Sequence, residues 1–355
     1  MSNNEIYYKY ISPRLPDTVL DFHTHVWRSD HWLKKPGDEM EHRDNDTGLF
    51  TAAKYVTCLT DYPFHTLMDD AGLSFPDKEY YAVCFGCPTP QADTGTTNSY
   101  VTSGAKEKAD LFPLIVAGGG KIIPRELEMQ LDTGGYFGYK VFLNWVGDDY
   151  KDIRVEDMLT EEEIEIANRR HLVVLLHVPR SGRLADPVVQ AGVRKLAAAC
   201  QNARIVLAHC GRCYHPFEMS RAIASVADLH NVYMDTSMVM EPIVIETAIR
   251  AMGAGRLVFG TDFPVAAMRG KRVNIGTHWV DVVGEGYPES QYRVPADNIP
   301  QLYMAQEIAL AVIIAADAAG VSGKSLKDIF YNNGMEILER VKTSDKNASI
   351  IGIRL

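Results

Sequence analysis

The sequence predicts a single-domain α/β fold, a (β/α)8 TIM barrel in which parallel strands alternate with helices. Three observations support this prediction. Short apolar segments typical of strands buried on both faces alternate with helical patterns. Histidine and aspartate residues end several of these segments, as active-site residues do at the C-terminal face of a barrel. No internal repeat, low-complexity segment or long linker divides the chain. A doubly wound open sheet is the alternative.

The first half of the chain carries four predicted strands. The stretch 19–27 is apolar and rich in β-branched or aromatic residues, and Pro16 and Asp17 precede it. Residues 1–18 are predicted as an N-terminal extension that lies over the outside of the fold, so the barrel covers about 19–341 of a single domain, 1–355. The other strands are predicted over Tyr80–Phe85, Phe112–Ala117 and Tyr139–Asn144. Helices are predicted over Leu49–Cys58, Phe64–Ala71, Ser99–Leu111 and Pro124–Leu131, with a turn-rich loop over Gln91–Thr97.

The second half alternates more regularly between strands and helices. Thr160, with Glu163 three residues later, forms a capping-box pattern at the start of the helix Thr160–Arg170. Strands are predicted over Leu172–His177, Arg204–His209, Val232–Thr236 and Arg256–Thr261. The helices between and after them are predicted over Pro187–Cys200, Phe217–Ala227, Pro242–Met252 and Leu302–Ala319.

Composition and charge exclude several classes of protein. The chain has 355 residues and a net charge of −10, which argues against nucleic acid and acidic membranes as partners. No signal peptide is visible at the start, and the longest apolar run, Ile308 to Ala316, is too short to span a bilayer. The six cysteines are sparse for a secreted disulfide framework. We therefore expect a cytoplasmic protein with reduced thiols.

Histidine and aspartate residues mark the strand ends. His23 and His25 alternate along the first strand, so their side chains share one face and can bind one metal ion. His177, His209 and Asp262 end the fifth, sixth and eighth strands, and these ends meet at one face of a parallel barrel. For any one of them, a capping or buried polar role is the alternative. Together they are typical of a catalytic metal site, with zinc as the first choice and manganese or iron as alternatives.

The same residues resemble the pattern of a known family. His23-Thr24-His25, His177, His209 and Asp262 resemble the amidohydrolase superfamily, and more closely its amidohydrolase-2 branch. This branch includes aminocarboxymuconate-semialdehyde decarboxylase and related hydrolases, lactonases and hydratases. The matching phrases are Asp69-Asp70-Ala71-Gly72, Gly138-Tyr139-Lys140, Ala208-His209-Cys210-Gly211, Phe259-Gly260-Thr261-Asp262-Phe263-Pro264 and Asn332-Asn333-Gly334. The resemblance therefore covers roughly 19–341.

The resemblance implies a role for each matched residue. His23, His25, His177 and Asp262 would bind one divalent metal ion, and His209 would act on the substrate beside it. In hydrolytic members Asp262 would accept a proton from metal-activated water while His209 polarises the substrate carbonyl. The implied activity is hydrolysis of an ester, lactone or amide bond in a small carboxylated molecule. Decarboxylation of a small acid is the alternative, because both reactions use the same ligand set.

The number of metal ions depends on the fourth strand. Some branches of the superfamily carry a carbamylated lysine on this strand, where it bridges two metals. Lys140 lies at the beginning of the predicted strand, so we expect it to face the opposite end of the barrel, which favours one metal. The resemblance also implies a homodimer.

Candidate substrate-binding residues lie next to the strand ends: Arg180, Arg183, Arg212 and Trp145. Guanidinium groups match the geometry of carboxylates. On a chain with a net charge of −10, three arginines beside a metal site predict a small anionic substrate. The alternative is that some of them pair with local carboxylates such as Asp186 and Glu218.

Two other patterns suggest different chemistry. Cys84 with Cys87, and Cys210 with Cys213, form two C-x-x-C pairs that could indicate a second metal or a redox role, although independent small residues are the simpler interpretation. The segment 318–325 resembles a phosphate-binding loop with Lys324, as in a nucleotide-binding enzyme. Only thirty residues follow Ser325, too few for the sheet and the magnesium ligand that such a fold needs, and the preceding apolar run is better explained as a helix.

Overall fold

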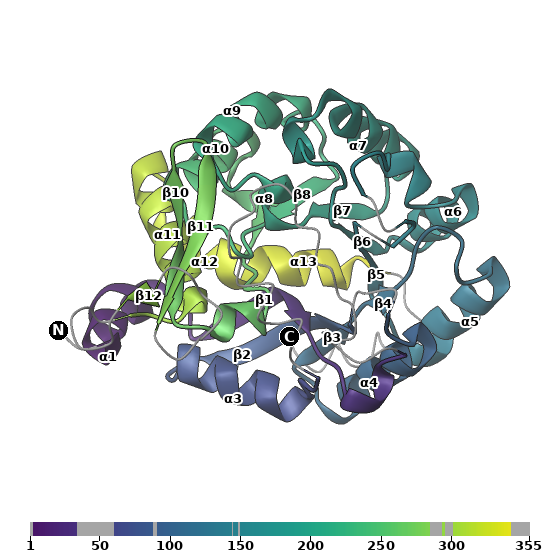
Figure 1. The fold of residues 1–355 in the computed structure, drawn as a ribbon, viewed down its shortest axis with the longest axis horizontal. Helices are drawn as coiled ribbons and strands as arrows, with labels where there is room; N and C mark the ends of the chain where they lie inside the picture. Colours follow the sequence, from purple (N-terminus) through teal and green to yellow (C-terminus); the bar gives the residue numbers. More distant parts are fainter. Residues whose placement is uncertain are drawn as a thin grey trace.

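The computed structural model describes residues 3–33, 60–87, 91–143, 145–147, 150–284, 293–294 and 301–341. Within these residues, parallel strands form a barrel with helices around its outside (Figure 1). The barrel segments are β1 (Thr18–His25), β2 (Glu79–Phe85), β3 (Leu111–Pro113), β4 (Ile115–Val116), β5 (Gly138–Val141), β6 (Val173–Leu176), β7 (Arg204–Leu207), β8 (Val232–Asp235) and β9 (Leu257–Val258).

Backbone hydrogen bonds close these segments into a barrel. β1 to β3 form one parallel sheet and β4 to β9 another. The amide of Leu114 donates to the carbonyl of Cys84 at 2.9 Å, so β3 and β4 are two halves of one barrel strand. At the other junction the amide of Phe22 donates to the carbonyl of Phe259 at 2.8 Å and joins β1 to the strand of β9. The described chain therefore contains the predicted closed barrel, and the open doubly wound sheet is excluded.

Helices cover the outside of the barrel and one of its ends (Figure 1). They are α3 (Phe64–Ser74), α4 (Thr94–Glu107), α5 (Pro124–Gly134), α6 (Glu161–Arg170), α7 (Pro187–Ala199), α9 (Pro216–Ala222), α10 (Pro242–Met252), α11 (Met304–Ala319), α12 (Gly323–Lys327) and α13 (Asn333–Glu339). Their ends follow local chemistry. The side chain of Thr160 accepts from the amide of Glu163 at the start of α6, and Gly320 ends α11 in the left-handed conformation.

Two elements differ from the sequence prediction. α4 begins five residues before Ser99, inside the segment expected to be a loop, because the side chain of Asp93 caps it through the amide of Thr96 at 2.8 Å. An antiparallel hairpin of β10 (Gly270–Ile275) and β11 (His278–Gly284), continued by β12 (Arg293–Val294), follows the barrel where no strand was predicted. Alternating residues around the two-residue turn at Gly276 were the available signal. The predicted helix over 49–58 lies outside the described residues.

The N-terminal residues pack against the barrel. The helical turns α1 (Asn3–Ile6), η1 (Tyr7–Ile11) and η2 (Ser12–Arg14) precede β1 and bury Tyr7 and Ile11 in the core. The hydroxyl of Tyr7 donates to Asp77 at 2.6 Å, which ties this segment to the turn before β2. Among the described residues, no helix combines the length and the apolar character that crossing a membrane requires.

Candidate metal centre and active site

Three side chains at the ends of β1 and β9 form the centre of the site. His23 and His25 lie on one face at the end of β1, as their alternation predicted, and Asp262 follows β9. The Nε2 atom of His25 is 3.1 Å from Oδ1 of Asp262, and Nε2 of His23 is 3.3 Å from the same oxygen. The ligand atoms of the three residues lie within 4.8 Å of one another, close enough to bind one metal ion.

Two further histidines extend this cluster. His209 follows β7, and its ring centre lies 4.8 Å from that of His23 and 4.9 Å from that of His177, which follows β6. The structure thus brings all five sequence-predicted residues to one end of the barrel. His177 does not belong to the group whose ligand atoms meet within 4.8 Å. Its Nδ1 atom is nevertheless buried without a hydrogen-bond partner among the described residues, so a donor atom remains uncommitted there.

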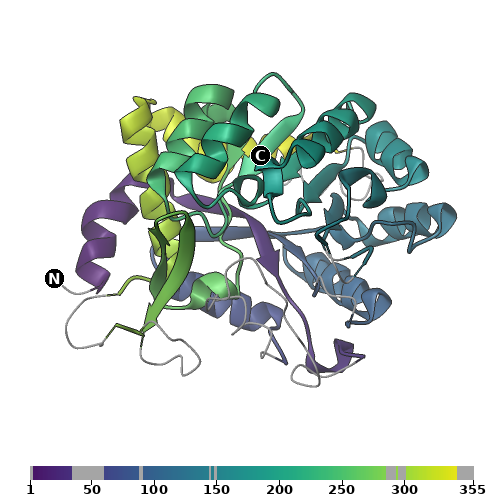
Figure 2. The same ribbon diagram turned by 45° about the horizontal axis from the view of Figure 1, so that its top comes forward.

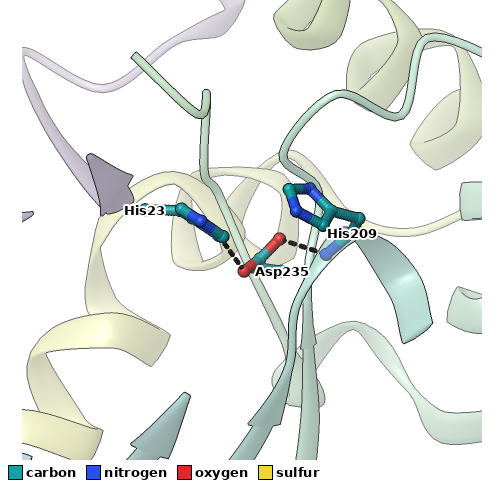
Figure 3. Close-up of side chains that lie close together, drawn as sticks. All are labelled: His23, His209 and Asp235. Carbon is teal, nitrogen blue, oxygen red and sulfur yellow. Dashed lines mark hydrogen bonds and ion pairs between the residues drawn. The ribbon is translucent and has the colours of Figure 1, made fainter. Parts of the chain in front are cut away.

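Asp235, at the end of β8, contacts both His23 and His209. The sequence analysis did not identify it as a site residue. Its Oδ2 atom lies 2.8 Å from Nδ1 of His23, and its Oδ1 atom accepts from the backbone amide of His209 at 2.8 Å (Figure 3). The carboxylate therefore holds the proton of His23 on Nδ1 and leaves Nε2 unprotonated, with its lone pair available to a metal ion. The available signal was an aspartate at the end of the predicted seventh strand, in the same position as His209 and Asp262 on theirs.

Lys140 corrects the sequence analysis, which placed it at the opposite end of the barrel. Its side chain is fully buried, and Nζ lies 3.0 Å from Nε2 of His23. The expectation was wrong because β5 spans only Gly138–Val141, so Lys140 is close to the end of the strand and points inward. Burial lowers the pKa of Lys140 to about 8, although the negative charges of Asp235 and Asp262 act to raise it. A metal ion bound through Nε2 of His23 would displace this amine, because the metal and the N–H group of Lys140 need the same lone pair.

Burial sets the protonation of the cluster. It lowers the pKa of His25 and His209, and it lowers the pKa of His23 and His177 well below the ordinary value. Burial alone would raise the pKa of Asp262, but the hydrogen bond from His25 and the neighbouring imidazoles hold it well below its usual range. Neutral imidazoles beside an ionised carboxylate are the donor set that divalent zinc prefers, so the residues present fit a metal ion.

The backbone that carries these residues is unusual. His209, Cys210, Gly211 and Arg212 have φ values of 55°, 50°, 68° and 60° and together form a left-handed turn. Asp262 also has a positive φ, 76°. Such a conformation costs roughly 1–2 kcal/mol for each residue with a side chain. Strained backbone that surrounding contacts enforce is concentrated at functional sites, and here it coincides with the metal and substrate candidates.

The predicted substrate arginines have different partners. Arg180 donates to Asp186 at 2.8 Å and Arg183 to Glu218 at 2.6 Å, which is the alternative that the sequence analysis left open for them. Arg212 is only 5% exposed, and its Nη1 atom donates to the backbone carbonyls of Val178 and Arg180. Among the described residues, no carboxylate pairs with it.

The side chain of Trp145 is buried. It is 3% exposed, and the ammonium group of Lys121 lies 4.3 Å from the centre of its ring. Its indole Nε1 is buried without a hydrogen-bond partner among the residues that the structure describes. The structure thus places Trp145 beneath the lysine, and its predicted role as a wall of the substrate site stays a prediction.

The two competing patterns find ordinary structural explanations. Neither metal-binding group found among the described residues contains a cysteine, and burial raises the pKa of Cys84, Cys210 and Cys213. Lys324 is largely exposed in the short helix α12 and pairs with Asp328 at 2.9 Å. The segment before it is helix α11, as expected, and not the strand that a phosphate-binding loop requires.

Comparisons with known proteins identify a family and similar folds. A family model described as Amidohydrolase matches residues 20–272. An amidohydrolase from Burkholderia multivorans with bound zinc superposes with a TM-score of 0.57 at 15% identity, over 90% of this chain and 99% of that one. A 5-carboxyvanillate decarboxylase from Novosphingobium aromaticivorans with bound manganese gives a TM-score of 0.56 at 12% identity, over 91% and 97%. A 2,6-dihydroxybenzoate decarboxylase from Rhizobium gives 0.53 at 12% identity, over 91% and 99%. No curated protein matches.

Proposed function

The chain belongs to the amidohydrolase family, and from this membership and the geometry of the site we propose that it is a metal-dependent hydrolase. The proposed reaction is cleavage of an ester, lactone or amide bond in a small carboxylated molecule. The observation that carries the proposal is the meeting of His23, His25 and Asp262 at one point, with neutral imidazoles around an ionised carboxylate.

His23, His25 and Asp262 would hold the metal, with His177 beside them. A divalent cation bound there supplies Lewis acidity, which polarises a carbonyl and lowers the pKa of water. Zinc is the first choice, and manganese is the alternative that the decarboxylase structure suggests. We propose one ion, because the second metal-binding group, which joins His23 and His209 through Asp235, is already committed to internal hydrogen bonds.

Two groups of the chain would move protons. Asp262 is ionised and accepts the proton of the attacking water through its carboxylate. The Nδ1 atom of His209 lies 3.0 Å from the backbone carbonyl of Ser237, which can only accept, so Nδ1 carries the hydrogen. The unprotonated Nε2 atom of His209 would therefore receive this proton from Asp262 and pass it to the oxygen or nitrogen of the departing group.

The environment of Arg212 supports the proposal that the substrate is anionic. Arg212 is a buried cation, and no described carboxylate neutralises it. Burying an uncompensated charge costs several kcal/mol, a cost that a bound carboxylate would offset. Arg180 and Arg183 keep a weaker claim, because each already pairs with a carboxylate, Asp186 or Glu218.

Decarboxylation is the second candidate. It is favoured by the decarboxylases among the similar folds and by an ion site that both reactions can use. In that reaction the bond to the carboxyl group breaks, and carbon dioxide leaves instead of an alcohol or amine. The two functions therefore differ in what they release.

The test is an assay of zinc- and manganese-loaded protein against lactones, N-acyl amino acids and aromatic acids, with acid release and carbon dioxide both recorded. We expect about one metal per chain by elemental analysis and acid release without carbon dioxide. His23→Ala/His25→Ala should lose both metal and activity. Carbon dioxide release would establish the second candidate. Full activity after exhaustive chelation, or an unchanged metal content in the double variant, would contradict both.

A further inference from the structure

The β10–β11 hairpin contributes to the active-site end of the barrel. Most of it lies beyond residue 272, where the match to the family model stops. The hairpin rests on the loops that follow β7 and β8. His215 Nε2 lies 2.7 Å from the carbonyl of Gly276 in the hairpin turn, and Asn274 donates to Glu241 at 3.1 Å. In Figures 1 and 2 it stands on the side of the barrel near α10 and α11.

Arg272 of this hairpin is a buried cation with a fixed orientation. It is 7% exposed, and its Nε and Nη2 atoms donate to the two carboxylate oxygens of Asp281 at 2.8 and 2.9 Å. Asp281, on β11, is fully buried. The bidentate pair leaves Nη1 as the guanidinium nitrogen that Asp281 does not engage.

Two aromatic rings contact the guanidinium of Arg272. Its guanidinium carbon lies 3.8 Å from the ring centre of Trp279 and 4.5 Å from that of Tyr214. Trp279 is 5% exposed, and its Nε1 atom has no hydrogen-bond partner among the described residues. A buried indole N–H normally finds an acceptor, so this one points to an acceptor that the described residues do not supply.

Tyr214 connects Arg272 to the proposed reaction centre. The ring centre of Tyr214 lies 6.1 Å from that of His209, so one aromatic ring separates Arg272 from the proposed proton carrier. The negative charge of Asp262 also acts on Arg272, which places the guanidinium within electrostatic range of the ion site. A small molecule with its reacting carbonyl beside His209 would therefore extend toward the hairpin.

Stability alone is a weak reason for this arrangement. A buried ion pair often contributes less than apolar residues of the same volume, because desolvation of both charges offsets their attraction. Asp281, Trp279 and Tyr214 instead hold a guanidinium in one orientation, which is what recognition of a planar anion needs.

We propose that Arg272 is a specificity-determining residue, which binds an anionic oxygen group of the substrate, a carboxylate in the simplest case. Trp279 supplies a second donor beside it. This inference rests on the proposed function for the position of the reacting carbonyl, but it concerns binding and can be tested without turnover.

The test uses dicarboxylates from succinate to adipate as probes, each beside its uncharged-end match, the monoamide. One carboxylate of the probe stands for the reacting acyl group and the other for the anionic end of a substrate. Calorimetric titration of the metal-loaded full chain should give at least tenfold tighter binding for one dicarboxylate than for its monoamide. In Arg272→Gln/Asp281→Asn, which removes both charges of the pair, this ratio should fall to about one.

Two further variants make the result decisive. Arg14→Gln/Asp317→Asn removes a bidentate pair on the outside of the protein and should keep the ratio. If the first double variant does not fold, Arg272→Lys, which keeps the charge beside Asp281 but loses the planar donors, should lower the ratio instead. A ratio near one for every probe in the wild type, or an undiminished ratio in the Arg272 variants, overturns the proposal. Discrimination in this titration, combined with no release of acid or carbon dioxide from the substrate panel, would leave it intact and contradict the proposed function alone.

Discussion

At the scale of single residues, three hydrogen-bonding contacts hold His209 in place. Its backbone amide donates to Asp235, and its Nδ1 atom faces both the carbonyl and the hydroxyl of Ser237. These contacts fix the tautomer and leave Nε2 on the side of the cluster. Because these protein groups hold His209, we expect its role in the reaction to be separable from metal binding.

His209→Asn should therefore keep the metal and the fold but lower kcat by about 10²-fold or more, the range for loss of a positioned acid–base group. Steady-state kinetics and elemental analysis of the same preparation measure both effects. His31→Asn, at a buried histidine that contacts Thr97, is the matched control and should keep full activity. Loss of metal from the His209 variant would make His209 a ligand, and full activity would reduce it to a packing residue.

Arg212 permits a second test at this scale. Arg212→Met should weaken binding of a carboxylated substrate by about 2–4 kcal/mol, because the charge-assisted contact is lost. The corresponding neutral ester should bind almost unchanged. Inhibition or KM measurements with the two compounds check this. Arg180→Met, which removes an arginine already paired with Asp186, is the control. Equal losses for both compounds would mean that Arg212 is structural.

At the scale of elements, the left-handed turn after β7 carries both His209 and Arg212 directly after one strand. Gly211 lies in this turn with a φ of 68°, and a Cβ there would lie 2.7 Å from the side chain of Leu184. Gly276, in the hairpin turn, has a similar φ of 63° but open space around it. The two glycines therefore separate backbone strain from crowding.

Gly276→Ala should lower the free energy of unfolding by about 1 kcal/mol, from backbone strain alone. Gly211→Ala should lower it by about 2–4 kcal/mol, because a clash in a packed core adds to the same strain. Urea unfolding of both variants compares them directly. Equal destabilisation would show that Leu184 moves aside at little cost, and that the turn is held by its backbone alone.

At the scale of the whole molecule, burial of so many titratable groups at one barrel end makes stability depend on pH. Folded His23 and His177 have a pKa well below the ordinary value near 6.5, and the pKa of His25 and His209 is also lowered. The unfolded chain therefore binds more protons as the pH falls through 6.5, and stability decreases. Asp21 acts in the opposite direction, since burial raises its pKa from 3.8 to about 7.

The free energy of unfolding of the metal-free protein should fall by about 1–2 kcal/mol from pH 6.5 to 5.5. His23 and His177 each contribute about 1 kcal/mol to the decrease, the other two histidines add to it, and Asp21 offsets about 1 kcal/mol. Denaturant unfolding at the two pH values measures this. A constant or rising stability would mean that the folded cluster takes up protons as readily as the unfolded chain.

The sequence by itself determined the barrel, the residues at the strand ends and the meeting of His23, His25 and Asp262. Apolar runs, caps and alternation are local patterns, and in a parallel barrel every strand end comes to the same face. The cap at Asp93 and the hairpin were also visible locally, but they were not recognised.

Only the tertiary structure decided which side chains meet. Lys140 reaches His23 because β5 ends at Val141, and a shift of one residue would have turned it to the other face. The pairing of Arg272 with Asp281 likewise depends on the register of the hairpin, and Asp235 reaches His23 across the barrel. Contacts between segments distant in sequence depend on register and on the loops that connect them, which local patterns do not specify.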